Sequence, residues 1–175
     1  MESKLSIQHI ADELPSLFAE RLGIYYASTV DQVHKKENGQ FFTPRPIASL
    51  MGSFASSSKT SLRILDPGCG TAILTCALIE YLLTYSKVKS IKLVAYELDQ
   101  AIIPYSQESL NYLKQWLLLK KVDFEFTLNT NDFVLENADC LTENEDLFAE
   151  KKEKFDIVIS NPPYFKLSIN DKRSM

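Results

Sequence analysis

The chain has 175 residues, of which 45% are hydrophobic and 24% charged, and its formal net charge is -4. This length suits one domain with a substantial apolar core and is short for a complete two-domain enzyme. The acidic balance argues against a broad phosphate-binding surface, because nonspecific affinity for nucleic acid comes mainly from clustered Lys and Arg. No apolar run approaches the roughly 18 to 20 residues that span a bilayer, and the first residues lack the pattern of a secretory signal. We therefore expect a soluble, cytoplasmic chain with no membrane partner.

Cysteine and histidine are few and scattered. Cys69, Cys76 and Cys140 form no close CxxC pair and leave one thiol unpaired whatever the bridging, which suits a reducing compartment. His9 and His34 lie far apart in sequence and near no cysteine cluster. We therefore predict no disulfide framework and no metal site.

The first third of the chain predicts a helical segment ahead of the main domain. Apolar residues recur at near-helical spacing over residues 5–22, where Pro15 is expected to interrupt or kink the helix. Residues 25–39 turn polar and are predicted to form an exposed connection. We accordingly divide the chain into an N-terminal helical segment, residues 1–38, whose role is open, and a domain over residues 39–175.

Strands and helices alternate after a short predicted helix at residues 47–54. The predicted strands cover residues 62–66, 91–97, 123–128 and 155–160, and the predicted helices cover residues 71–85 and 100–120. Pro104 is expected to fall in the first turn of the second helix or to break it. The charged region 136–154 is predicted to be an insertion with a short helix around Leu147. Strands separated by helices imply right-handed βαβ units. The predicted fold class is α/β, a Rossmann-like, doubly wound and mainly parallel sheet.

The first predicted strand runs through a glycine-containing turn into a helix. Gly68 and Gly70 allow the backbone to approach a ligand at the carboxyl end of this strand, where open α/β sheets bind nucleotides. The segment has neither the full GxGxxG spacing nor the P-loop pattern. A tight turn without a ligand therefore stays open as an alternative at this point.

Acids follow the next two predicted strands. Glu97 ends the second strand and is a candidate to accept hydrogen bonds from a ribose diol, while Asp99 is expected to cap the following helix. After the third strand, Asp132 is a candidate acceptor for the exocyclic amine of an adenine, and Phe133 a candidate to pack on its face. The alternatives are solvated strand-end acids and an ordinary Asx turn.

The strongest motif, Asn161-Pro162-Pro163-Tyr164, follows the fourth predicted strand. The prolines fix φ, so nearby carbonyls point in set directions. Asn161 Oδ1 and the Pro162 carbonyl can both accept from an NH2 group, and Tyr164 can stack on the base that carries it. The alternative is a rigid turn leaving the sheet.

The order of these segments resembles the γ-type amino-methyltransferases of bacterial restriction-modification systems. In that family a cofactor motif precedes the glycine-containing loop, the acid and Asn-Pro-Pro-Tyr, and Gly-Gln-Phe-Phe-Thr-Pro at residues 39–44 looks like this first motif. The match covers residues 39–164. The first motif and the preceding helical region look most like fused type IIG enzymes or the modification subunits of type I systems.

The resemblance implies S-adenosylmethionine as the cofactor and the N6 atom of a flipped-out adenine in DNA as the methyl acceptor. By resemblance, Thr43 would hold the methionine carboxylate, and Asp66 and Gly68 would lie along the methionine part. Glu97 would bind the ribose and Asp132 the adenine amine.

The sequence departs from the family in two places. Ala72 stands where the family often has a second loop glycine, and the chain stops eleven residues after Tyr164, before the remaining strands and any target-recognition domain. We therefore expect the isolated fragment to be inactive. Double-stranded DNA is expected to be held mainly by missing C-terminal regions, with a nuclease or a specificity domain or subunit as a further candidate partner.

Two other functions stay open on the sequence. Methyltransferases that act on a glutamine side chain of a translation factor, or on a guanine amine in RNA, also use Asn-Pro-Pro-Tyr. The second alternative is a non-catalytic fragment that holds S-adenosylmethionine or only a partner subunit.

Overall fold

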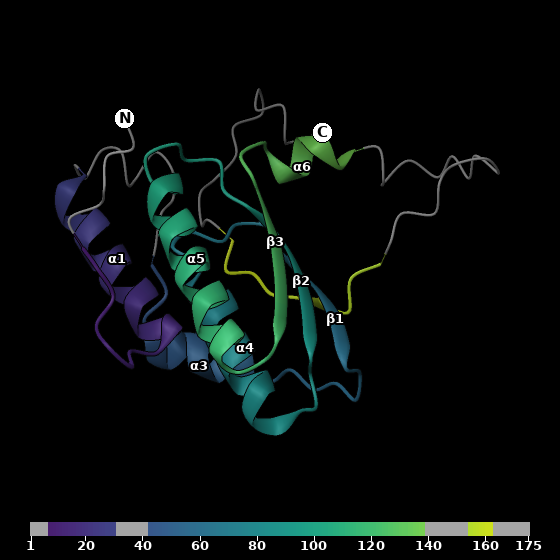
Figure 1. Cartoon of the computed structure of the whole chain (residues 1–175). Helices are drawn as coiled ribbons and strands as arrows, with labels where there is room; N and C mark the ends of the chain where they lie inside the picture. Colours follow the sequence, from purple (N-terminus) through teal and green to yellow (C-terminus); the bar gives the residue numbers. More distant parts are fainter. Residues whose placement is uncertain (1–6, 31–41, 139–153, 163–175) are drawn as a thin grey trace.

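Parallel strand pairing organises the chain in this computed structural model, which describes residues 7–30, 42–138 and 154–162. The strands are β1 (Ser61–Asp66), β2 (Ser90–Tyr96), β3 (Asp123–Asn129) and β4 (Ile157–Val158). They lie in the order β3-β2-β1-β4, and every neighbouring pair is parallel (Figure 1). The predicted parallel α/β sheet is thereby confirmed.

Helices cover one face of this sheet. The elements are α1 (Pro15–Thr29), α3 (Arg45–Ser53), α4 (Ile73–Tyr85), α5 (Ile103–Leu119) and the single turn α6 (Phe133–Glu136). α4 links β1 to β2, and α5 links β2 to β3. α1 and α3 both pack on α4, so Figure 1 shows all four longer helices on the same side of the strands.

The apolar core is centred on α4, whose side chains are hydrophobic nearly all round. Such a helix is stable only when it is enclosed on most sides. Leu74 and Leu78 of α4 belong to the same buried cluster as Ile64 of β1 and Leu93 of β2. The same cluster includes Ala48 of α3, so α4 lies between the sheet and the outer helices.

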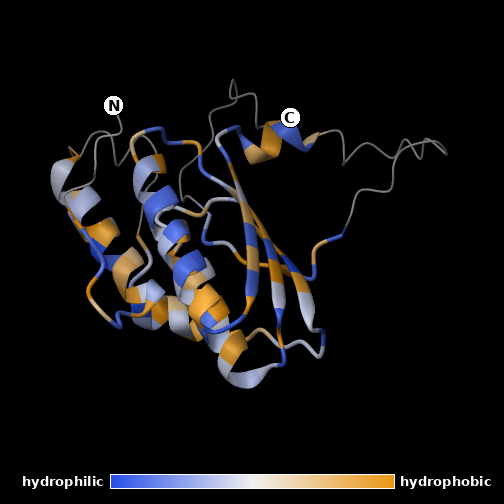
Figure 2. Ribbon diagram, viewed as in Figure 1, coloured by the Kyte–Doolittle hydropathy of each residue, from blue (hydrophilic) through white to orange (hydrophobic). Residues whose placement is uncertain are grey.

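The edge strand β3 alternates between hydrophobic and hydrophilic residues, as Figure 2 shows. Successive side chains of a strand point to opposite faces. Phe124 and Phe126 therefore share the face that packs into the core cluster. Glu125 points to the other face, where its carboxylate lies 3.4 Å from Lys92 Nζ of β2. This exposed pair contributes little stability.

The N-terminal helix differs from the prediction at both ends. Pro15 does not kink a helix in progress; it lies in the first turn of α1, where its missing N–H costs no hydrogen bond. α1 also continues into the predicted connection as far as Thr29, and the Tyr26 side chain in this last turn is buried. The predicted helix around Leu147 lies outside the described residues, and so does most of the connection to residue 42.

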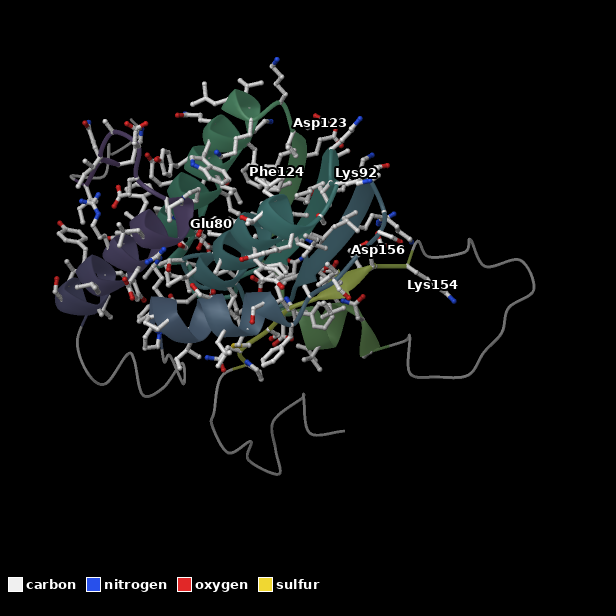
Figure 3. All side chains as sticks on the ribbon, turned by 90° about the horizontal axis from the view of Figure 1, so that it is seen from below. Glu80, Lys92, Asp123, Phe124, Lys154 and Asp156 are labelled. Carbon is white, nitrogen blue, oxygen red and sulfur yellow. The ribbon has the colours of Figure 1, made fainter. Side chains whose placement is uncertain are left out.

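Glu80 fixes the start of α1 on α4. Its carboxylate accepts hydrogen bonds from the backbone N–H and the hydroxyl of Ser16, both at 2.7 Å, and points from α4 towards α1 (Figure 3). Burial raises the pKa of Glu80, and the two Ser16 donors and the charge of Arg45 lower it. The arrangement satisfies an N–H at the helix N-terminus, which has no partner within the helix.

The close approach of α3 to α4 gives the first prediction. A Cβ at Gly52 would lie 3.0 Å from the Leu78 backbone N and Cα, atoms that cannot move without shifting α4. We expect Gly52→Ala to lower the free energy of unfolding by about 1 to 2 kcal/mol, since overpacking outweighs the better helix propensity of alanine. Chemical denaturation measures this. An unchanged midpoint would show that the two helices are further apart than described.

Candidate functional site

The carboxyl ends of the four parallel strands meet at one edge of the sheet. β1 pairs with β2 on one side and with β4 on the other, so the strand order changes direction at β1. Open α/β sheets bind ligands in the crevice at such a point. Asp66 ends β1, Glu97 directly follows β2, and Asp132 and Asn161 each come three residues after β3 and β4. Four predicted site residues are thereby brought to the same edge.

The loop after β1 leaves space at its two glycines. A Cβ at Gly68 or at Gly70 would meet no atom within 4 Å. Gly70 has φ +54°, which favours glycine, and Cys69 N–H donates to the Tyr96 carbonyl at 2.9 Å. The loop is therefore tied to β2 while its glycines face open space.

Ala72, the predicted departure from the family pattern, takes the left-handed conformation immediately before α4. Its φ is 63° and its ψ is 24°, and its side chain is fully buried. An L-residue in this conformation costs roughly 1 to 2 kcal/mol. This backbone conformation therefore costs more free energy with alanine at position 72 than with glycine.

Asp66 is a fully buried acid at the end of the central strand. The Thr75 hydroxyl donates to its Oδ2 at 2.7 Å, whereas Oδ1 has no hydrogen-bond donor among the described residues. The pKa of Asp66 is raised to about 7, chiefly by burial. The charge of Glu97 also raises it, whereas the Thr75 hydroxyl and the Gly68 N–H lower it. A buried acceptor atom with no full donor suits a positively charged ligand group.

Glu97 joins the two loops beside it. Its Oε2 accepts from Gly70 N–H and its Oε1 from Asp99 N–H, each at 2.9 Å. Burial raises the pKa of Glu97, the amides of Asp99 and Gly70 lower it, and the charge of Asp99 raises it. Backbone N–H groups thus hold both oxygens of this carboxylate at the end of β2.

Asp132 and Phe133 lie at the start of α6. Asp132 Oδ1 accepts from the N–H groups of Val134 and Leu135 at 2.9 and 3.1 Å, so this carboxylate caps the helix. Phe133 packs edge-on against Tyr96 with 5.0 Å between ring centroids. Their proposed contacts with an adenine stay predictions, because both side chains also have these structural tasks.

Asn161 lies beside the predicted cofactor motif. The Ile159 N–H donates to the Leu65 carbonyl at 3.0 Å, which extends the pairing of β4 with β1 and places Asn161 next to the loop after β1. The Asn161 amide nitrogen donates to Thr43 Oγ1 at 2.8 Å, and Thr43 is buried. Pro162 is exposed, whereas Tyr164 lies outside the described residues.

Three residues at this edge were not predicted from the sequence as part of the site. Ser106 of α5 donates to the Gly70 carbonyl, and Thr75 comes from a helix that is otherwise apolar. Leu98 is 51% exposed between two acids. An exposed leucine at a strand end is the one pattern of the three that a sequence reading could have singled out.

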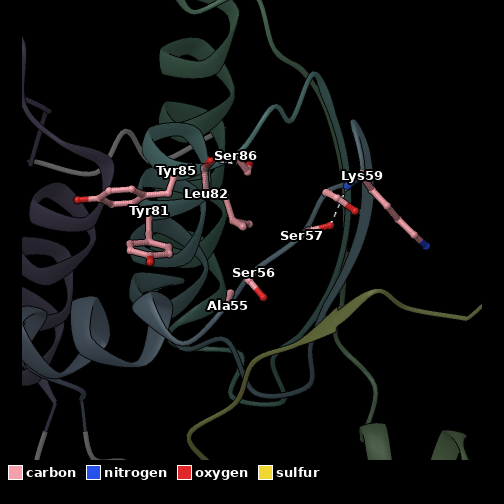
Figure 4. A pocket seen from close by; sticks show the side chains of 9 residues that line it. Ala55, Ser56, Ser57, Lys59, Tyr81, Leu82, Tyr85 and Ser86 are labelled. Atoms are coloured by element: carbon pink, nitrogen blue, oxygen red, sulfur yellow. Dashed lines mark hydrogen bonds between the residues drawn. The ribbon is translucent and has the colours of Figure 1, made fainter.

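A hollow of about 640 Å³ lies at the opposite end of the sheet (Figure 4). It is lined by the serines of residues 56–58, which precede β1, and by Tyr81 and Tyr85 near the end of α4. It is therefore separate from the candidate site. Within the described ranges we find no group of three metal-ligating side chains and no helix long and apolar enough to cross a membrane.

Comparison with known proteins agrees with this geometry. The sequence model of the family described as N-6 DNA methylase matches residues 22–174. The chain belongs to the N-6 DNA methylase family. The matched region contains α1 from residue 22 onward and every strand, so the family domain covers most of the chain.

Three relatives illustrate the range of this similarity. The chain is 32% identical over 140 residues to the type II methyltransferase M.BsuBI of Bacillus subtilis, and 27% over 150 residues to M.AccI of Acinetobacter calcoaceticus. These matches cover 79% and 86% of the chain but 27% and 22% of the relatives. A tRNA1(Val) (adenine(37)-N6)-methyltransferase of Haemophilus influenzae is 26% identical, covering 84% of the chain and 54% of that protein. The chain thus spans about a quarter of the type II methyltransferases it matches.

Solved structures share the fold of this N-6 DNA methylase domain. A Listeria monocytogenes protein described as a class I S-adenosylmethionine-dependent methyltransferase has a TM-score of 0.55 at 19% identity, covering 89% of this chain and 42% of that one. A Vibrio vulnificus modification subunit of a type I restriction enzyme has a TM-score of 0.51 at 20% identity, covering 90% and 30%. The class I methyltransferase fold is therefore confirmed.

The buried Asp66 carboxyl gives the second prediction. Its pKa is about 7 in the folded chain and 3.8 when unfolded, so between these values the folded state binds a proton that the unfolded state does not. Stability contributed by this group therefore falls as pH rises from about 4 to 7. We expect the stability difference between Asp66→Asn and the native chain to shift in favour of the variant over this interval, by a few kcal/mol in total, roughly 1.4 kcal/mol per pKa unit.

Denaturant titrations at several pH values measure this difference. Glu80 and Glu97 are present in both proteins, so their titration largely cancels. A difference between variant and native chain that is flat from pH 4.5 to 8 would contradict the burial of a titrating Asp66.

Proposed function

We propose that this chain provides the cofactor and amine-binding motifs of an S-adenosylmethionine-dependent DNA adenine-N6 methyltransferase of a restriction-modification system. The hydrogen bond between Asn161 and Thr43 carries the proposal, because it joins the two motifs at the edge where Asp66 and Glu97 lie. Family membership and the type II relatives support the DNA substrate.

The residues at the edge fit S-adenosylmethionine. The open space over Gly68 and Gly70 accommodates a ligand close to the backbone, and we assign the Glu97 carboxylate to the ribose hydroxyls. Oδ1 of Asp66 suits the cationic methionine part of the cofactor. Thr43 is assigned to the methionine carboxylate. When bound, the cofactor supplies an electrophilic methyl group on its sulfonium.

Asp132 and Phe133 are assigned to the adenine of the cofactor. Oδ1 of Asp132 accepts from two N–H groups of α6, so the cap fixes this carboxylate at the edge. The Phe133 ring is held by Tyr96, which leaves its position fixed for packing against a base. The residues we assign to the adenine thus lie at a helix start.

The orientation of the Asn161 amide suits a target amine. Its nitrogen donates to Thr43, and we assign its Oδ1, together with the Pro162 carbonyl, to accept hydrogen bonds from the N6 protons. The amine lone pair of adenine is delocalised into the ring and is a poor nucleophile. Two acceptors on the N6 protons favour the tetrahedral nitrogen that attacks in line. We assign stacking on the flipped base to Tyr164.

We assign the grip on double-stranded DNA mainly to regions outside this acidic segment. Its net charge of -4 offers little phosphate attraction. In the type II relatives about three quarters of the length lies outside the matched part. A nuclease or a specificity domain or subunit is the further partner we propose.

An RNA substrate is the second candidate function. The similarity to the Haemophilus influenzae tRNA methyltransferase covers 84% of the chain, and the same amine-binding geometry serves an adenine in RNA. Methylation assays on duplex DNA and on tRNA with the protein as its gene encodes it separate the two. Incorporation into tRNA alone would replace the proposed substrate and keep the proposed chemistry.

The third prediction concerns the space over Gly68. A methyl group there meets no protein atom within 4 Å, so Gly68→Ala should change stability by less than about 0.5 kcal/mol. The same methyl would enter the proposed cofactor space, so affinity for S-adenosylmethionine should fall at least about tenfold. Calorimetric titration of the protein as its gene encodes it measures this. Unchanged affinity would move the cofactor away from this loop.

The fourth prediction concerns Asn161. Replacing it with Ala removes an acceptor for the target amine, and we expect methyl transfer to fall by about 100-fold to 1,000-fold. Asn111, exposed on α5 away from the edge, provides the matched Asn→Ala control and should keep full activity. Radiolabelled methyl incorporation into DNA measures both. An active Asn161→Ala variant would eliminate the proposed role of the motif.

A further inference from the structure

Helix α1 reaches the candidate site through one buried tyrosine. Tyr26, in the last turn of α1, is 1% exposed, and its hydroxyl donates to Asp99 Oδ2 at 2.6 Å. Oδ1 of Asp99 accepts from Ala101 N–H, so both oxygens of this carboxylate are held. A contact over 73 residues thus fixes the side chain of the second acid after β2.

Asp99 is linked in turn to Glu97. Its N–H donates to Glu97 Oε1, while Glu97 Oε2 accepts from Gly70 N–H. The Gly70 carbonyl accepts from the Ser106 hydroxyl of α5. The Tyr26 hydroxyl therefore belongs to a connected set of hydrogen bonds that runs through the proposed ribose acid into the glycine loop.

The ring of Tyr26 contacts the other side of the site. It packs edge-on against Phe42, with 5.7 Å between ring centroids, and against Tyr105 at 5.4 Å. Phe42 directly precedes Thr43. A Cβ at Gly23, one turn before Tyr26, would lie 3.3 Å from the Phe42 ring, so α1 approaches this residue closely. Helix α1 thus supports the glycine-loop side and the Thr43 side together.

We propose that Tyr26 is a positioning residue for the cofactor site, whose hydroxyl holds Glu97 in place through Asp99. The proposal rests on the assignment of Glu97 to the ribose under the proposed function. The Tyr26 hydroxyl ties the Asp99 segment to α1, so its loss removes one restraint on the backbone whose N–H donates to Glu97. Residues of the N-terminal helical segment thereby take part in cofactor binding without touching the cofactor.

The test compares two tyrosines that each fasten the α1 region. Tyr26→Phe removes the hydroxyl and keeps the ring contacts. Tyr112→Phe is the matched control, because the buried Tyr112 hydroxyl of α5 donates to the Glu13 carbonyl just before α1 and contacts neither Glu97 nor Asp99. Both variants are made in the protein as its gene encodes it. Amide hydrogen exchange is followed over the segments that contain Gly70 and Asp99.

We expect faster exchange of these two amides in Tyr26→Phe and native exchange in Tyr112→Phe. The dissociation constant of S-adenosylhomocysteine should rise about threefold to tenfold in Tyr26→Phe only. In a Glu97→Gln background the same substitution should have little additional effect, because its action passes through the lost carboxylate.

Two results overturn the proposal: unchanged exchange in Tyr26→Phe, or a loss of affinity that is the same with and without Glu97. A native protein that binds no S-adenosylhomocysteine, but whose Tyr26→Phe variant still exchanges faster, would instead contradict the proposed function. In that case Tyr26 would still be shown to position Glu97.

Discussion

The parallel register of four strands is the constraint on which the candidate site depends. Because β1 pairs with β2 and β4 in the same direction, the residues after each strand meet at one edge. Segments that are far apart in sequence then need only short loops to face one another. The side chains that follow the strands differ in type, but the backbone hydrogen bonds between the strands bring them close together.

The edge concentrates acids that oppose folding in the absence of a ligand. Burial raises the pKa of Asp66 and of Glu97; the charge of Glu97 raises the pKa of Asp66 further, and the charge of Asp99 raises that of Glu97. This cost is borne by the core around α4, which supplies one polar group, the Thr75 hydroxyl, to the more deeply buried acid. A cationic ligand beside Asp66 would relieve part of the same cost. Sites that are unfavourable when empty and favourable when filled are common where function requires binding.

Strong local patterns in the sequence were sufficient for most of the fold. The strand and glycine turn around Asp66 were predicted and are confirmed. Of the two outcomes predicted for Pro104, the structure has the first, a position in the first turn of α5. The start of α1 was wrong because a proline begins a helix as readily as it breaks one, and only packing decides between the two. The predicted end of the N-terminal helix was wrong because the chain after Leu22 is polar in composition, although Tyr26 in this stretch is buried.

The candidate site was predictable only as a set of separate motifs. Asn161 and Thr43 lie 118 residues apart, and no local pattern specifies which atom of the amide meets the hydroxyl. The same holds for Tyr26 and Asp99. Such contacts follow from strand order and from how closely α1 packs, which are properties of the whole domain.

The neutral amide at position 161 suits an edge that already holds several carboxylates. An acid next to the loop of Asp66 would be a further like charge in a buried region, and like charges there raise one another's pKa. An amide offers an acceptor oxygen without that charge, and its nitrogen provides the donor that fixes it to Thr43. A carboxylate has no such donor, so it would depend on the Thr43 hydroxyl for its orientation. The choice of Asn161 therefore follows from the same electrostatics that make Asp66 hard to ionise.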